Sequence, residues 1–202
     1  LERFIFGRER KEDEDFGIYR HLFLAQSKDK DIIRTCQDGG IATTLLVYAL
    51  EKGIVEGAIV SGVGEKEPLK AVPKLATTRE EIIECAGTRY TYSPNMFAFK
   101  EGIKQKKKSL AFVGTPDQIL AMRKIQVLPL KKLSEALCFT IGVFCSECFL
   151  YEGFVKELIQ RQLGVDLYAV KKVNIKGKLI ITMNTGDVKT VPLKDAKKYA
   201  SN

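Results

Sequence analysis

Residues 38–61 read DGGIATTLLVYALEKGIVEGAIVS, and this stretch indicates the fold class. After the turn at Asp38-Gly39-Gly40, apolar residues recur at helical spacing through residues 41–52, which predicts a helix with one buried face. Residues 55–61 follow as a short apolar run with β-branched side chains, which predicts a strand. We expect an earlier strand at residues 21–26, and the order strand, helix, strand is typical of an α/β sheet.

The rest of the chain continues this alternation and then changes character at residue 165. Strands are expected at residues 71–77, 110–113 and 137–144, and helices at residues 95–106, 117–126 and 151–163, with a shorter one opened by residues 78–81. Beyond residue 165, three β-type runs separated by turns predict an antiparallel meander, followed by a short helix at 193–200. We therefore predict an α/β fold, with a mixed sheet flanked by helices and a small C-terminal antiparallel β meander. The expected parts are an N-terminal arm at 1–20, an α/β core at 21–164 and a β-meander appendage at 165–202.

Composition excludes several classes of protein. The 202 residues are 45% hydrophobic and 29% charged, which is ordinary for a globular chain and argues against a disordered or fibrous one. No apolar run approaches the ~20 residues that a membrane span requires, and the charged first ten residues do not resemble a signal peptide. We therefore expect a cytoplasmic protein. The single histidine argues against multi-histidine metal sites and Ser-His-Asp chemistry.

The net charge of +8 raises the question of a nucleic-acid partner. The densest basic stretch, residues 104–108, is not interleaved with the aromatic residues that base stacking requires. Solvated helix ends and hairpin edges explain most of the charge, and we expect no nucleic-acid partner. The alternative is a surface that attracts an anionic cofactor or an acidic partner subunit.

The five cysteines are an odd number and do not suggest a disulfide framework. Cys85 and Cys138 lie in apolar segments and are most simply core residues. Only Cys145-Ser-Glu-Cys148 has the spacing of metal ligands. On spacing alone, this pair can be half of a zinc or iron–sulfur site, a redox pair or a coincidence.

Three loops have the composition of a ligand site. The Gly39-Gly40 turn opens a helix that carries Thr43 in its first turn, and free N–H groups at a helix N-terminus suit phosphate. Residues 86–95, AGTRYTYSPN, combine hydroxyls, flat rings and a fixed cation, which suits a ligand with phosphate and aromatic parts. Residues 114–118, GTPDQ, follow an apolar strand, and α/β sheets bind ligands at the carboxyl ends of strands. The structural alternatives are a simple turn, a polar crossover and helix initiation by Pro116.

Five motifs, taken in order, resemble those of the coenzyme F420 hydrogenase/dehydrogenase beta-subunit family. They are CQDGGIATTLLVYALEKG with VEGAIVSG (36–62), AGTRYTYSPN (86–95), VGTPDQILAMRKIQ (113–126), IGVFCSECFLYEGF (141–154) and the meander VNIKGKLIITMNTGDVKTVPLKD (173–195). The resemblance extends over roughly residues 27–202 in order and spacing. It identifies residues 21–164 as a flavin-binding core.

The resemblance implies an oxidoreductase subunit, cytoplasmic and without a membrane span, that binds FAD. Such a subunit passes electrons between an iron–sulfur chain and coenzyme F420, its substrate, as in the F420-reducing hydrogenases of methanogenic archaea. The implied partners are the catalytic and small electron-transfer subunits of a hydrogenase or dehydrogenase complex. The alternatives are a related FAD/iron–sulfur reductase with a different acceptor, and a non-catalytic flavin-binding fragment.

The resemblance also implies a set of cofactor-binding residues, with no side chain assigned to proton transfer. They are Gly39, Gly40, Thr43, Thr88, Arg89, Tyr90, Ser93, Asn95, Gly114, Thr115, Pro116 and Gln118. The family's iron–sulfur ligands are matched only in part: Cys145 stands at a ligand position, Asp117 stands where relatives carry Cys, and Cys148 does not match. A further Cys-x-x-Cys normally follows the point where this sequence ends, so we expect the protein to continue. A 4Fe–4S cluster is therefore implied for the full-length protein, whereas this chain lacks a complete cysteine set.

Overall fold

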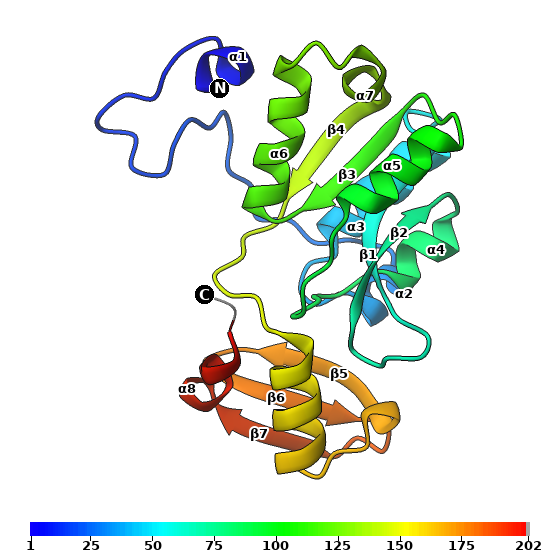
Figure 1. Ribbon diagram of the computed structural model, residues 1–202, viewed down its shortest axis with the longest axis vertical. Helices are drawn as coiled ribbons and strands as arrows, with labels where there is room; N and C mark the ends of the chain where they lie inside the picture. The colour runs from blue at the N-terminus through cyan, green and yellow to red at the C-terminus, as the bar shows by residue number, and fades with distance from the viewer. Residues whose placement is uncertain (201–202) are drawn as a thin grey trace.

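A computed structural model describes residues 1–200 of the chain (Figure 1). Its helices are α1 (Glu2–Phe6), α2 (Lys30–Thr35), α3 (Ile41–Glu51), α4 (Arg79–Glu84), α5 (Met96–Lys104), α6 (Pro116–Val127), α7 (Lys131–Ala136), the π-helix η1 (Glu152–Gln162), the short η2 (Leu167–Ala169), α8 (Leu193–Ala196) and η3 (Lys197–Tyr199). Its strands are β1 (Gly57–Val63), β2 (Ala71–Ala76), β3 (Leu110–Gly114), β4 (Leu137–Gly142), β5 (Val170–Ile175), β6 (Lys178–Met183) and β7 (Val188–Pro192). None of the helices in this described range is long and apolar enough to cross a bilayer.

The first sheet is mixed, with strand order β2-β1-β3-β4. Strands β1, β3 and β4 run parallel, whereas β2 returns antiparallel beside β1. Alternating residues of β1 face opposite layers: Ala58 and Val60 pack with α2, α3 and α4, whereas Ile59 packs with α5 and α6. The helices therefore cover both faces of the sheet, as Figure 1 shows.

The second sheet is the antiparallel meander β5-β6-β7, which confirms the predicted C-terminal meander. Helix η1 lies across it (Figure 1), and its buried Phe154, Val155 and Ile159 share a core with Leu179 and Ile181 of β6. Together, η1, the meander and the short helices after it form what we call the C-terminal unit, residues 149–200. The α/β class with an appended meander is thus as predicted, while the expected boundary at residue 164 stays a prediction.

The strand expected at residues 21–26 is absent, and that prediction was wrong. The segment is coil, and the side chains of Leu22, Phe23 and Leu24 are 81%, 84% and 105% exposed. Apolar composition suggested a strand, but no neighbouring strand pairs with this segment in residues 1–200. Helix α3 therefore leads into the first strand, β1, and the parallel crossovers are β1 to β3 and β3 to β4.

Candidate functional site

The three predicted loops lie on the side of the mixed sheet where its parallel strands end. β3 ends at Gly114, directly before loop 114–118, and the arrowheads of β3 and β4 point toward the C-terminal unit in Figure 1. Loop 86–95 contacts the third loop, where Gln118 Nε2 donates to the Ser93 carbonyl at 2.6 Å, and a Cβ built on Gly87 would lie 3.4 Å from the carbonyl oxygen of Thr35, the last residue of α2. The second and third loops are thus directly bonded, and the second also lies against the end of α2, the helix that precedes the first loop.

The Gly39-Gly40 turn is tightly packed against the segment before it. A Cβ at Gly39 would lie 2.7 Å from the Ala25 carbonyl oxygen, and one at Gly40, whose φ is +71°, would lie 2.7 Å from Ile32 Cγ2. Thr44, one residue beyond the predicted Thr43, donates to Ser27 Oγ at 2.8 Å, while Thr43 is buried within α3. Packing alone therefore requires both glycines, and their contact with a phosphate stays a prediction.

A buried polar network joins the second and third loops beneath the ends of β1 and β3. Asn95, 2% exposed, accepts through Oδ1 from Ser93 Oγ at 2.7 Å and from Ser61 Oγ at 3.1 Å. Its Nδ2 donates to the Val113 carbonyl oxygen at 2.9 Å. Since buried polar groups are costly to leave unpaired, these bonds fix the loops before any ligand arrives. We call Ser61, Ser93, Asn95 and Gln118 the Asn95 network.

Arg89 is a largely buried guanidinium without an acidic partner among residues 1–200. Nη2 reaches the carbonyl oxygens of Glu84 and Ala86 at 3.4 and 3.3 Å, whereas the buried Nε has no hydrogen-bond partner. Burial lowers the pKa of Arg89 from its ordinary value because desolvation disfavours the cation. An unpaired buried cation is the kind of group that an anionic ligand would satisfy.

Tyr90 connects loop 86–95 to the C-terminal unit. Its hydroxyl accepts a hydrogen bond from the Ile175 backbone N–H at 3.0 Å, and its carbonyl accepts one from the Phe149 N–H at 2.9 Å. Burial raises the pKa of the Tyr90 phenol. Beside it, Lys176 pairs with Asp38 at 3.0 Å, so the segment before the Gly39-Gly40 turn is also linked to the β5–β6 turn. The structure thus places Tyr90 between two parts of the fold, which sequence periodicity did not indicate.

The third loop combines a tight turn with a helix start. A Cβ at Gly114 would lie 2.7 Å from Phe112 Cε1, so only glycine fits without displacing the ring. Pro116 is exposed at the first position of α6, and the Thr115 hydroxyl donates to the Asp117 carboxylate. The helix-initiation interpretation of Pro116 is therefore confirmed.

The cysteines do not assemble a metal site in the described residues. No group of three or more His, Cys, Asp or Glu side chains there could hold a metal ion. Cys145 is exposed, and its Sγ lies 3.4 Å from the Glu147 carbonyl oxygen. Burial raises the pKa of the Cys148 thiol, and Cys145 and Asp117 are near enough to raise it further. Cys138, predicted to be a core residue, is exposed on β4, whereas Cys85 is buried as expected.

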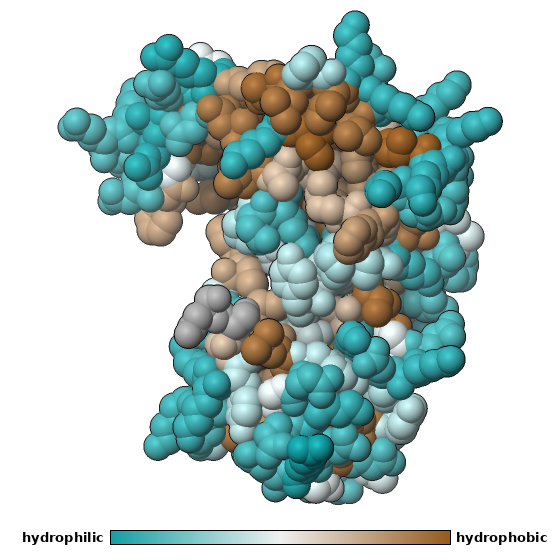
Figure 2. Space-filling view, viewed as in Figure 1, coloured by the Kyte–Doolittle hydropathy of each residue, from teal (hydrophilic) through white to brown (hydrophobic). Residues whose placement is uncertain are grey.

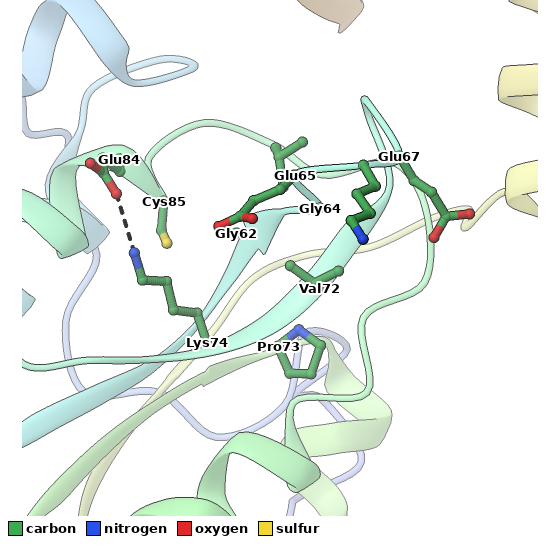
Figure 3. A pocket seen from close by; sticks show the side chains of 11 residues that line it. Gly62, Gly64, Glu65, Glu67, Val72, Pro73, Lys74, Glu84 and Cys85 are labelled. Atoms are coloured by element: carbon green, nitrogen blue, oxygen red, sulfur yellow. Dashed lines mark hydrogen bonds and ion pairs between the residues drawn. The ribbon is translucent and has the colours of Figure 1, made fainter.

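A cavity lies elsewhere, between the β1–β2 hairpin and the end of α4. It has a volume of about 690 Å³, and we call it the hairpin cavity. Its lining comprises Gly62–Glu67, Val72–Lys74, Glu84 and Cys85 (Figure 3). None of the twelve predicted cofactor residues lines it, although Cys85 directly precedes loop 86–95. Sequence reasoning missed it because glycine and valine at strand ends resemble ordinary hairpin residues; the Gly62-x-Gly64 pair was the available signal.

Parallel strands that end in glycine- and hydroxyl-rich loops define an α/β fold of the kind that places ligand sites at this edge of the sheet. Comparison with known proteins then gives the family. The beta-subunit N-terminal model of coenzyme F420 hydrogenase/dehydrogenase matches residues 22–100, and the C-terminal model matches residues 107–202. The chain belongs to the coenzyme F420 hydrogenase/dehydrogenase beta-subunit family, as the motifs predicted.

Individual relatives agree with this assignment. The chain is 40% identical over 192 residues to coenzyme F420 hydrogenase subunit beta of Methanosarcina barkeri, covering 93% of this chain and 65% of the relative. The subunit of the same name from Methanothermobacter thermautotrophicus is 38% identical over 187 residues, covering 91% and 66%. A chain in a solved structure of the F420-reducing [NiFe] hydrogenase complex from Methanosarcina barkeri superimposes with a TM-score of 0.80 at 39% identity, covering 87% of this chain and 61% of that one. The chain thus spans about two thirds of the length of these relatives.

Proposed function

We propose that this chain is the flavin-binding part of an electron-transferring beta subunit of an F420-reducing hydrogenase, and that it acts in the cytoplasm. Family membership and the names of the relatives support the class of enzyme. The structural observation that carries the flavin assignment is Arg89, a buried guanidinium whose Nε is unpaired within a loop of hydroxyl groups. Its charge fits the phosphate of FAD.

The three loops are proposed to hold FAD, each in a different way. Gly39, Gly40 and Thr43 would lie against the phosphates or the ring, and Thr88, Arg89 and Tyr90 would form a second wall with Ser93 and Asn95. Gly114, Thr115, Pro116 and Gln118 would form the third. Within this set, Ser93, Asn95 and Gln118 have side chains hydrogen-bonded to one another or to backbone carbonyls, so their contribution is to hold the loops in position.

A bound flavin supplies the ability to exchange both single electrons and hydride, which allows it to connect iron–sulfur clusters with a deazaflavin. The protein's contribution is position, solvent exclusion and electrostatics. Arg89 offers positive charge to the phosphates, and the buried Ser93, Asn95 and Gln118 keep the loop backbone rigid. The net charge of +8 would attract the acidic tail of F420.

The partners are proposed to be the catalytic and small electron-transfer subunits of a hydrogenase or dehydrogenase complex. A 4Fe–4S cluster in the full-length protein would use Cys145 at a family ligand position, with Asp117 at a second. Asp117 and Cys145 are both exposed, so neither is sealed into the fold. Additional ligands would have to come from outside residues 1–200.

Reconstitution with FAD tests the proposal. The expected result is a yellow protein with quenched flavin fluorescence that, when supplied with a redox partner, reduces F420 with loss of its visible absorption or oxidises the reduced form with its return. The Arg89→Met variant should bind FAD more weakly, whereas Arg161→Met, which removes an exposed cation on η1, should bind as the native chain does. A native chain that binds no FAD would contradict the proposal.

A second candidate is a non-catalytic flavin-binding fragment. The observation that favours it is the lack of any metal-holding side-chain group within residues 1–200. Retention of FAD without electron transfer to F420, in the presence of the partner subunits, would support this candidate. A related reductase with a different acceptor would instead bind FAD and fail only with F420.

A further inference from the structure

We propose that residues 12–26 of one copy of this chain dock on the β4 edge and the adjoining α6–α7 corner of a second copy, and that the second copy returns the same contact. We call residues 12–26 the docking segment and residues 123–142 the receiving face. The product is a closed, two-fold symmetric dimer in which each copy gives one segment and receives one. The inference is independent of flavin binding, because neither surface contains any of the twelve predicted cofactor residues.

The docking segment carries large apolar side chains that are left uncovered within residues 1–200. Those between 81% and 105% exposed are Phe16, Leu22, Phe23 and Leu24. The segment ends where the Ser27 N–H donates to the Gly39 carbonyl at 2.8 Å, and Figure 1 shows the chain before this point looping out beside α6. Single exposed apolar residues are common on protein surfaces, but four of them within nine consecutive positions indicate an interaction site.

The mixed sheet offers one edge strand that has no protection against pairing. Its two edges are β2 and β4. β2 contains Pro73, which has no N–H to donate, and Lys74, and both residue types are typical of edges that avoid pairing. β4 reads LCFTIG, without proline or charge, and no strand pairs with its outer edge within residues 1–200. This edge is therefore open to the addition of a strand.

Residues 21–26 suit the β4 edge in length and composition. They read HLFLAQ, six residues against the six of β4, and they are coil in their own copy. A strand added to β4 would give the exposed backbone groups of both segments main-chain hydrogen bonds. A second copy thus supplies the pairing partner that residues 21–26 lack in their own.

Charge complementarity sets the direction of docking. The segment begins with three exposed acids that form no ion pair within residues 1–200, namely Glu12, Asp13 and Asp15. The receiving face begins with three exposed lysines that are likewise unpaired in this part of the chain, namely Lys124, Lys131 and Lys132. The acids precede residues 21–26 as the lysines precede β4, so a parallel added strand brings opposite charges to the same end. Such exposed charges act mainly on orientation and on the rate of association.

The apolar area is sufficient for a stable dimer. A Phe side chain buries about 150–250 Å², so Phe16 and Phe23 offer roughly 300–500 Å² on each segment. With both segments and the equal area that they cover, reciprocal docking buries about 1,200–2,000 Å², the size of a specific interface. The receiving face is apolar too: Val127, Leu128 and Leu130 are exposed, and Figure 2 shows apolar surface gathered over this upper end of the α/β part. A one-sided contact would bury half as much, which favours a second copy as the occupant.

Sedimentation equilibrium of the purified chain over a range of concentrations tests the proposal. We expect a reversible dimer of twice the chain mass. Leu22→Asp with Leu24→Asp places charges at exposed positions of the segment and should raise the dimer Kd about tenfold or more. Val188→Asp makes the same kind of change at an exposed position of β7 and should leave the Kd unchanged. With melting temperatures showing that both variants fold, a monomeric native chain or an unaltered Kd in the segment variant would overturn the proposal.

Charge reversal tests the direction of docking. Lys131→Glu with Lys132→Glu should weaken the dimer, and the further changes Asp13→Lys and Asp15→Lys in the same chain should restore it, because both sides of the contact are then reversed. The matched control reverses two exposed lysines of the meander, Lys171 and Lys178. Equal dimer Kd values for the control and the Lys131→Glu, Lys132→Glu variant would contradict the proposed face.

Mixing the two defective chains tests the exchange itself. The Leu22→Asp, Leu24→Asp variant keeps its receiving face, and the Lys131→Glu, Lys132→Glu variant keeps its segment, so an intact contact can form only between the two. A heterodimer on mixing, weaker than the native dimer because it has one intact contact, supports the proposal. No heterodimer, from variants that have each lost self-association, overturns it. If the native chain is monomeric and its segment instead binds a hydrogenase subunit, the second copy is excluded as the occupant.

Discussion

The Asn95 network and the cysteine segment after β4 stand at the ends of neighbouring strands, yet they are built in opposite ways. Asn95, Ser93 and Gln118 are each less than 10% exposed and hydrogen-bonded to one another or to backbone carbonyls. By contrast, residues 143–146 are exposed, and Phe144 is fully exposed at 107%. The polar groups of the first region are hydrogen-bonded within residues 1–200, whereas the second region is open to solvent.

This difference in burial and hydrogen bonding bears on the two cofactors proposed for the chain, FAD and an iron–sulfur cluster. A preformed polar scaffold reduces the ordering cost of binding, so the loops over β1 and β3 are suited to a tightly held flavin. Within the described residues, Cys145 and Cys148 lie near each other and no group of three or more ligand side chains forms, whereas an iron–sulfur cluster is held by four ligands. The hydrophobic surface in Figure 2 is uneven as well, with brown apolar residues concentrated over the upper, α/β part of that face.

The largest loss of stability is expected in the Asn95 network. Asn95→Ala removes the acceptor of Ser61 and Ser93 and the donor to Val113, so several buried groups lose partners together. We expect a loss of about 3 kcal/mol in the free energy of unfolding, measured by urea denaturation. Asn184→Ala, a change at an exposed residue of the meander, should cost less than about 1 kcal/mol. Equal losses in the two variants would show that the network is not a scaffold.

Tyr90→Phe tests the connection between the scaffold and the C-terminal unit. Without the hydroxyl, the partly buried Ile175 N–H loses its acceptor, which should cost about 1–2 kcal/mol in the free energy of unfolding. FAD binding should also weaken, because loop 86–95 loses its hydrogen bond to Ile175. Tyr19→Phe, at an exposed position of the arm, is the matched control. A Tyr90→Phe protein as stable as this control would contradict the proposed anchoring role.

The pH dependence of folding stability should show how much Glu81 stabilises α4, the helix that precedes Cys85 and loop 86–95. The Thr77 N–H donates to Glu81 at 2.7 Å beside the capping box that Glu81 forms with Thr78, and this hydrogen bond holds the pKa of Glu81 below its ordinary 4.5. A lowered folded-state pKa contributes stability above the unfolded pKa, and that stability is lost as the pH falls through the folded value. Glu81→Gln should therefore cost about 0.3–1 kcal/mol at neutral pH and flatten the loss of stability below about pH 4.5, as followed by circular dichroism. A steeper acid loss in the variant would contradict this account.

The smallest effect is expected in the cysteine segment. Cys145→Ser alters an exposed side chain that contacts only its own loop, so stability should change by less than about 0.5 kcal/mol. FAD affinity of the chain should likewise remain unchanged. A large loss of flavin binding would show that the two regions are not independent.

Local patterns predicted most of the architecture. Helical periodicity indicated α3, α5, α6 and η1, alternation and turns indicated the meander, and the strand ends placed loop 114–118 correctly. The failures have a common cause in long-range packing. Residues 21–26 have strand-like composition but lack a pairing partner, and Cys138 lies in an apolar strand whose outer edge is exposed.

The candidate site was predictable only in part for the same reason. Polar composition identified loop 86–95, yet the pairing of Tyr90 with Ile175 joins residues 85 positions apart. The hairpin cavity depends on how β1, β2 and the end of α4 come together, and its glycines and valines carry no distinctive pattern. Motif resemblance indicated an expected ligand, whereas the shape of this cavity required the tertiary structure.

The central claim is that this chain holds flavin by itself and does not hold a cluster by itself. Calorimetric titration of the anaerobically purified chain with FAD, with iron quantified in the same sample after reconstitution, tests it most directly. The account predicts saturable, stoichiometric binding of FAD and no stoichiometric iron. Stable iron incorporation without flavin binding would contradict it.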